Sequence, residues 1–211
     1  GRAFLWAAVL TFFCIQSGRM NVAVDFDSLW YGVRSPYILD NGRGIYENMG
    51  TIGIVYTYSK GFEVLTLPLS VLPSFSFVTS FNLWLLAGIL WLFARVLEIC
   101  AGREERAAYE GGRATAGDGN NWGKSRAKAI EAAVCFAASL PGIMNMGITA
   151  KSDVATLCFQ MILFYEMLLY LKGESQGLWY GWAAFFFSWT MKPTALVFST
   201  AIMGMSMVFF F

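Results

Sequence analysis

Two aspartates, Asp25 and Asp27, lie one residue apart in the segment VAVDFDSLWY, directly after an apolar run. In an extended segment, side chains at positions i and i+2 point the same way, so both carboxylates can face one site. Two neighbouring carboxylates can bind a hard divalent cation through oxygen, or one of them can act as a general base. The structural alternative is helix capping, because aspartate is a good N-cap and a helix is expected to start near Ser28.

Asp153 and Lys192 are charged residues at the edges of apolar runs, in KSDVATLCF and SWTMKPTALVF. Asp153 stands where a helix is expected to begin, so it can be either a ligand-binding group or a cap. A lysine between two apolar runs marks a functional site or reaches the membrane interface, and at a broken helix it suits a phosphate. Arg34 and Lys60 are further cations that either meet an anionic headgroup or are solvated in a loop.

The composition predicts a membrane protein. Hydrophobic residues make up 57% of the chain, charged residues only 14%, and the mean hydropathy is +0.54. A soluble domain is nearer to about a quarter charged. The net charge of +1 argues against a nucleic-acid partner.

Histidine is absent and the cysteines are scattered, which limits the chemistry. Acid–base steps must use carboxylates, lysine or tyrosine. Any metal would be held by oxygen atoms, which favours Mg or Mn. The cysteines lack metal-ligand spacing and are interpreted as small buried apolar residues.

The fold class expected from the apolar runs is all-α, a polytopic transmembrane bundle with about six spans. A membrane-spanning helix needs ~20 mostly apolar residues. The last apolar run is interrupted by Lys192 and Pro193 and is read as two helices, because proline breaks a helix interior. The predicted spans are Ala3–Ile15, Phe75–Leu97, Ala129–Ile148, Val154–Leu171, Leu178–Met191 and Thr194–Phe211.

Two long connecting segments organise this single transmembrane domain, residues 1–211. Residues 99–128 are basic and are predicted to form a cytoplasmic loop by the positive-inside rule. Residues 18–74 form the first outer loop, in which 27–39 and 56–73 have the pattern of interfacial amphipathic helices. In this topology the polar groups around Asp153 and Lys192 share the outer side with that loop.

The order of these pieces resembles the N-terminal half of the GT-C glycosyltransferases, integral-membrane enzymes that use polyprenyl-phosphate-linked sugars. The resemblance is closest to relatives of protein O-mannosyltransferases and aminoarabinose transferases. It rests on Asp27 and Tyr31 in DSLWY, on Asp153 opening a span, and on Lys192 in TMKPT. The family often has a second acid directly after the first, where this chain has Ser28.

This resemblance implies inverting transfer of a sugar from a lipid phosphate to an acceptor on the outer or lumenal face. Asp27 is then the first choice for the base that takes the acceptor proton, and Asp25 the second. Lys192 would stabilise the departing phosphate, with help from Arg34 or Lys60.

Two further substrate-binding roles follow from the same resemblance. Asp153 would orient the acceptor or complete a metal site with Asp25 and Asp27, and Tyr31 would contact the substrate. Some relatives need a divalent metal, so Mg or Mn is a possible cofactor. The partners would be the lipid-linked donor, an acceptor of unknown class and the membrane, either the plasma or inner membrane or the endoplasmic reticulum.

Two other function classes stay open. A secondary transporter or lipid flippase also places charges at broken helices, but it predicts internal repeats and acids near mid-span. A noncatalytic membrane subunit would use the same polar residues only as caps and anchors. The chain is expected to be a fragment of a longer membrane protein, because apolar segments reach both of its ends.

Overall fold

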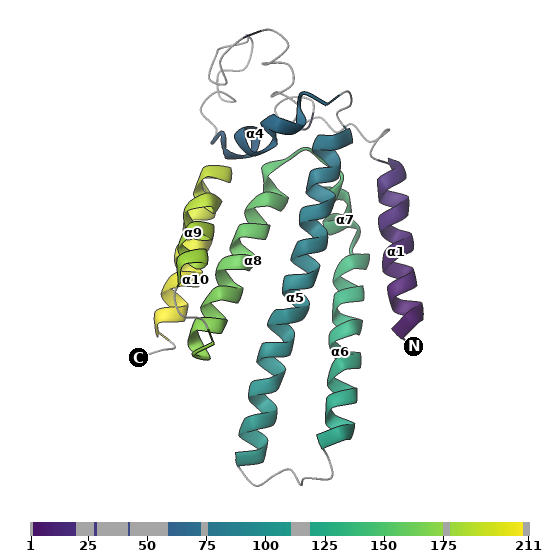
Figure 1. Ribbon diagram of the computed structural model, residues 1–211, viewed down its shortest axis with the longest axis vertical. Helices are drawn as coiled ribbons and strands as arrows, with labels where there is room; N and C mark the ends of the chain where they lie inside the picture. Colours follow the sequence, from purple (N-terminus) through teal and green to yellow (C-terminus); the bar gives the residue numbers. More distant parts are fainter. Residues whose placement is uncertain are drawn as a thin grey trace.

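A computed structural model of the chain describes residues 2–19, 28, 42, 59–72, 76–110, 119–174 and 178–208. Within these ranges every regular element is a helix, and the expected all-α fold class is confirmed at that level (Figure 1). The long helices run alongside one another, and the short helix α4 (Gly61–Thr66) lies across one end of the bundle, called here the α4 end.

The apolar runs lie largely within helices, some of which extend well beyond them. Each predicted span has a helical counterpart, and the break at Lys192 separates two helices as expected. The helices are α1 (Arg2–Arg19), α5 (Ser76–Glu110), α6 (Gly119–Ser139), α7 (Pro141–Gly147), α8 (Ser152–Leu171), α9 (Trp179–Met191) and α10 (Ala195–Val208).

Among the described residues, two segments, Phe77–Gly102 and Ser152–Leu171, are long and apolar enough to cross a membrane. A third is added if α6 and α7 together form one bent span. Helices α9 and α10 have 13 and 14 residues, so each is only about 20 Å long, against a hydrocarbon core of about 30 Å. Two or three spans are therefore supported by length and composition, and the count of six stays a prediction.

The predicted basic loop 99–128 is shorter than expected. Helix α5 continues to Glu110 and α6 already begins at Gly119, so much of the range is helical. The physical reason is that Ala, Glu and Arg dominate residues 101–110, and these are strong helix formers although they are not apolar. In Figure 1 the ends of α5 and α6 accordingly extend beyond the other helices.

The predicted span 129–148 is broken into two helices. The axes of α6 and α7 differ by 67° at a break around Leu140, whose backbone is extended. Pro141 follows at the start of α7, a position where its missing N–H leaves no hydrogen bond unmade. The proline therefore ends one helix and begins the next.

The segment 56–73, predicted as the second interfacial helix, contains a short helix, and its place at a membrane interface stays a prediction. Residues 61–66 form α4 and Leu67–Leu69 form a 3-10 turn that contains Pro68. The first predicted interfacial helix, residues 27–39, lies outside the described residues except for Ser28.

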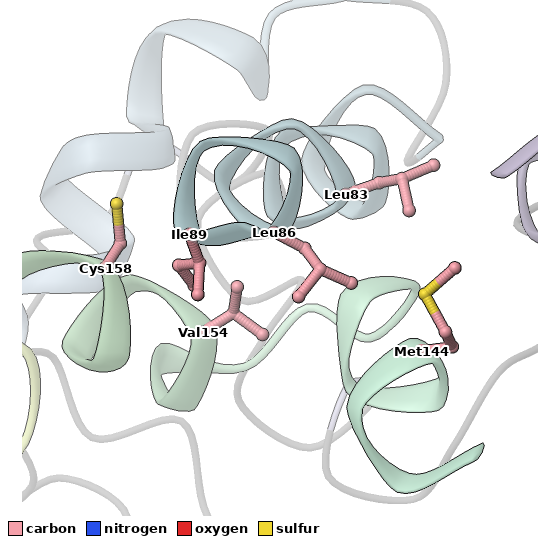
Figure 2. Packing of buried hydrophobic residues seen from close by; sticks show 6 residues of the cluster. All are labelled: Leu83, Leu86, Ile89, Met144, Val154 and Cys158. Atoms are coloured by element: carbon pink, nitrogen blue, oxygen red, sulfur yellow. The ribbon is translucent and has the colours of Figure 1, made fainter. Parts of the chain in front are cut away.

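The largest apolar cluster among the described residues joins α5, α7 and α8. Figure 2 shows Leu86 and Ile89 of α5 on the side of that helix that faces Val154 of α8, with Met144 of α7 completing the group. Met144 and Leu86 are almost fully buried. This packing fixes the start of α8, and with it the first turn that carries Asp153.

Candidate functional site

Asp153 and Lys192 are in direct contact at the α4 end. The Lys192 ammonium donates a hydrogen bond to the Asp153 carboxylate, although the two residues are 39 positions apart in the chain. The Lys192 side chain keeps 42% of its surface exposed, and the Asp153 side chain keeps 29%. The structure thus brings together two of the residues that the sequence singled out, at a position open to a ligand.

The backbone of α8 explains why an acid is stable at this place. Lys151 occupies the N-cap position of α8. The alternative prediction that Asp153 is the N-cap residue is therefore wrong. Asp153 lies in the first turn instead, where unpaired N–H groups give the helix end a partial positive charge that favours a carboxylate.

Lys192 is positioned by the break between α9 and α10. Its backbone is extended, and its N–H donates to the Ser188 carbonyl at 3.2 Å. Pro193 prevents α9 from continuing, and the Ala195 N–H donates to the Lys192 carbonyl at 2.9 Å to start the next helix. The Lys192 side chain therefore leaves from the carbonyl end of α9, where a cation is favoured.

A second lysine–acid pair lies at the same carbonyl end of α9. Lys60 and Glu63 of the α4 segment are 3.8 Å apart, and their side chains are only 2% and 6% exposed. Lys60 was expected as an outer loop cation, but it is buried. The Ser59 hydroxyl donates to the Trp189 carbonyl of α9 at 3.4 Å, so this segment also satisfies part of the helix end.

Gly61 allows this close approach of α4 to α9. A Cβ atom at residue 61 would lie 2.4 Å from the Thr190 carbonyl oxygen and 2.5 Å from its carbon. Both are backbone atoms that cannot rotate away. Only glycine fits here, which keeps Lys60 next to α9.

A cavity of about 480 Å³ lies between α4 and α9, within the usual size range of ligand sites. Its lining is mostly apolar, and Val64 and Phe187 at its edge are more than half exposed. It is lined by Ser59, Lys60, Gly61, Val64, Leu65, Phe187, Thr190 and Met191. The arrangement suits an apolar chain that ends near a charged group.

Met191 connects the cavity to the Asp153–Lys192 pair. It lines the cavity, precedes Lys192 in the chain and is 3% exposed. It belongs to an apolar cluster with Phe62, Val78, Ala150 and Ala155. These four residues come from α4, from α5, from the turn before α8 and from α8 itself. The two lysine–acid pairs therefore lie next to the same apolar cluster.

Ser28, from the early part of the first outer loop, also reaches this site. It is 3% exposed, and the Ala150 N–H donates to its hydroxyl oxygen at 2.9 Å. Ala150 belongs to the short turn before α8, three positions before Asp153. Ser28 directly follows Asp27 in the sequence.

Four predicted site residues lie outside the described residues: Asp25, Asp27, Tyr31 and Arg34. Among the residues that are described, no group of three His, Cys, Asp or Glu side chains gathers to hold a metal. The possible Mg or Mn site that includes Asp25 and Asp27 stays a prediction.

Two polar residues at the α4 end were missed in the sequence. Asn82 of α5 is fully buried and donates to the carbonyls of Thr149 and Lys151. Glu63 is the buried partner of Lys60. The signal for Asn82 was present, because an amide inside the apolar run FNLWLL is costly to bury without partners.

Comparison of the chain with protein-family models, curated proteins and solved structures finds no match. The functional argument therefore rests on the residues and their geometry.

Proposed function

We propose that the chain is part of a membrane glycosyltransferase that moves a sugar from a polyprenyl phosphate to an acceptor at the α4 end of the bundle. The observation that carries the proposal is the convergence at one end of the helices. The Asp153–Lys192 pair, the cavity bearing Lys60, and Ser28, the residue after Asp27, all meet there.

The reaction assigned to this site is an inverting displacement. An acceptor hydroxyl attacks the anomeric carbon, and Asp27 takes the hydroxyl proton, with Asp25 as the second candidate. The bond between that carbon and the phosphate oxygen breaks, and its electron pair stays on the phosphate. Lys192 stabilises this growing negative charge, sharing its ammonium between the phosphate and Asp153.

The cavity between α4 and α9 supports a lipid-borne donor. Its apolar walls suit part of an isoprenoid chain, while Lys60 and the nearby Lys192 supply positive charge for the phosphate end. Tyr31 and Arg34 are assigned to substrate contacts in the same proposal, and an oxygen-liganded Mg or Mn remains an optional cofactor.

The α4 end is assigned to the outer or lumenal side of the membrane, in a plasma, inner or endoplasmic-reticulum membrane. The exposed basic residues Lys124 and Lys128 lie in the first half of α6. They would face the cytoplasm, because α6 begins at the end of the bundle opposite α4 (Figure 1). Single cysteines placed at Lys128 and at Thr194 should therefore react with a membrane-impermeant thiol reagent from opposite sides. Labelling of both from one side would overturn the assignment.

The test of the function is a transfer assay with the full-length protein in lipid nanodiscs. Polyprenyl-phosphate sugars are supplied as donors, and the glycosylated product and released lipid phosphate are both measured. Asp27→Asn and Lys192→Met are expected to abolish transfer while the protein stays folded. Lys172→Met is the matched control, because Lys172 pairs with Glu174 at 3.9 Å at the opposite end of α8. Near-normal transfer by Asp27→Asn would refute the assigned base.

The transporter alternative makes a different prediction in the same preparation. A transporter or flippase would move a labelled lipid or solute across the membrane without forming a glycosylated product. Lys192→Met would then reduce flux only. The described charged pairs at the α4 end lie at helix ends and not at mid-span, which favours the transferase.

A further inference from the structure

The turn between α7 and α8 is held by side chains from two other parts of the chain. The Asn82 amide of α5 donates to the Thr149 carbonyl at 2.6 Å and to the Lys151 carbonyl at 2.8 Å. From the first outer loop, the Ser28 hydroxyl oxygen accepts from the Ala150 N–H at 2.9 Å. Thr149, Ala150 and Lys151 are thus each hydrogen-bonded to a side chain outside the turn.

The side chains that hold the turn, and Ala150 within it, are buried. Asn82 and Ala150 are 0% exposed, and Ser28 is 3% exposed. Buried backbone groups need protein partners, because water is not at hand to replace a lost one. Removing Asn82 would leave the half-buried carbonyls of Thr149 and Lys151 without their donor, and the turn would have to open for water to replace it.

The chemistry of asparagine fits this position. Both N–H bonds of one NH₂ group are needed to reach two carbonyls, and serine, aspartate or leucine cannot supply them. The other amide atom, Oδ1, is buried and hydrogen-bonds to none of the described residues. The side chain therefore acts here as a double donor.

The turn leads directly into the first turn of α8. Lys151, whose carbonyl Asn82 holds, is the N-cap of α8, and Asp153 follows two residues later. On the other side, the Thr149 hydroxyl donates to the Met146 carbonyl at 2.8 Å and closes the end of α7. The shape of the turn therefore determines both where Asp153 points and whether Ala150 can meet Ser28.

We propose that Asn82 is a positioning residue that couples the first outer loop to the Asp153–Lys192 pair. It shapes the turn 149–151 so that one side receives Ser28 and the other directs Asp153 toward Lys192. The consequence for sugar transfer rests on the proposed function, whereas the coupling itself does not.

Hydrogen exchange by mass spectrometry tests the coupling in the full-length protein in nanodiscs. Asn82→Leu removes both donors at similar volume, and Ser28→Ala removes the acceptor of the Ala150 amide. Each variant should raise the rate of amide hydrogen exchange in the peptide that covers Ala150 by about tenfold. For Asn82→Leu this effect would be indirect, because Asn82 does not bond the Ala150 amide itself. The control is Val134→Ala, a core truncation in the cluster around Leu90 and Ala138. It should destabilise the bundle without a selective change at the turn.

A second measurement separates positioning from general destabilisation. The Asp153→Asn and Lys192→Met changes are combined, and their interaction is measured by thermal unfolding. This interaction should be lost in the Asn82→Leu background and retained with Val134→Ala. An unchanged interaction, or unchanged exchange at Ala150, would refute the positioning role.

The outcomes also distinguish this inference from the proposed function. If Asn82→Leu loosens the turn and lowers kcat for transfer with little change in KM, both stand. If the turn loosens but transfer is unaffected, the positioning role stands and the use of Asp153 in transfer is refuted.

Discussion

Lys192 and Asp153 form an ion pair between the break that separates α9 from α10 and the first turn of α8. Each residue lies at the helix end that favours its charge, the cation after a carbonyl end and the acid near an N–H end. The pair is partly exposed, so its own contribution to stability is modest, roughly 0.2–1 kcal/mol. This modest contribution to stability is compatible with the phosphate-binding role proposed for Lys192.

The first prediction separates these two uses of the pair. Asp153→Asn and Lys192→Met should each lower the free energy of unfolding by no more than about 1 kcal/mol, because the pair is partly exposed. The charge-swapped double variant Asp153→Lys with Lys192→Asp should restore neither stability nor transfer, because each charge then lies at the helix end that disfavours it and the cation is at the start of α8. Thermal unfolding and the transfer assay together measure both effects.

The corresponding control is the Lys172–Glu174 pair beyond the other end of α8. Lys172→Met and Glu174→Gln should change neither transfer nor stability appreciably, because that pair is exposed and distant from the α4 end. Equal loss of transfer in the control variants would show that the assay reports protein loss and not the site.

The sequence predicted the helices well where apolar runs end in helix-breaking residues. The break at Pro193 was expected and observed, because proline leaves a strong local signal. The end of α5 was placed too early at Leu97, because hydropathy falls there while helix propensity does not. Hydropathy alone cannot show whether a helix ends with its apolar run or continues past it.

The candidate site was predicted only in part, for a related reason. Asp153 and Lys192 were recognised because a charge beside an apolar run is conspicuous. Their contact depends on how α8 packs against α9, which no local pattern encodes. The same holds for Asn82, whose role depends on a turn 67 and 69 residues further along the chain.

The second prediction concerns Gly61, where α4 crosses the end of α9. Gly61→Ala would place a Cβ atom 2.4 Å from the Thr190 oxygen, so α4 must move away. We expect a loss of stability of roughly 1–3 kcal/mol and a change in the cavity between the two helices, measured by thermal unfolding with and without added polyprenyl phosphate.

Gly88→Ala in α5 is the matched control for this substitution. Apart from the backbone of its own helix, no described atom lies within 4 Å of a Cβ at that position. The change should therefore be neutral or raise stability through helix propensity, by up to about 1 kcal/mol. If both variants behave alike, the tight contact between α4 and α9 does not determine the result.

The third prediction concerns the buried pair Lys60 and Glu63. Lys60→Met alone would leave a buried carboxylate without its cation, which typically costs about 3–5 kcal/mol. The double variant with Glu63→Gln should recover much of that loss, because no uncompensated charge remains. Unfolding of the single and double variants in detergent measures the difference. If the double variant is no more stable than the single one, the pair is not the reason for the loss.

The fourth prediction concerns the contact between two hydroxyl groups that joins α9 to α10, one helical turn before Lys192. The oxygens of Ser188 and Ser199 are 2.8 Å apart and fully buried, and Gln160 of α8 donates to Ser199 at 3.4 Å. Ser188→Ala should cost about 1 kcal/mol, and the double variant with Ser199→Ala less than the sum, because both changes remove one shared bond. Ser17→Ala in α1 is the control, since its hydroxyl is exposed and donates to the Phe13 carbonyl of its own helix. Because Ser188 also holds the Lys192 N–H through its carbonyl, loosening this contact should weaken the Asp153–Lys192 interaction as well. Strictly additive losses, with that interaction intact, would show that the two helices are held by other contacts.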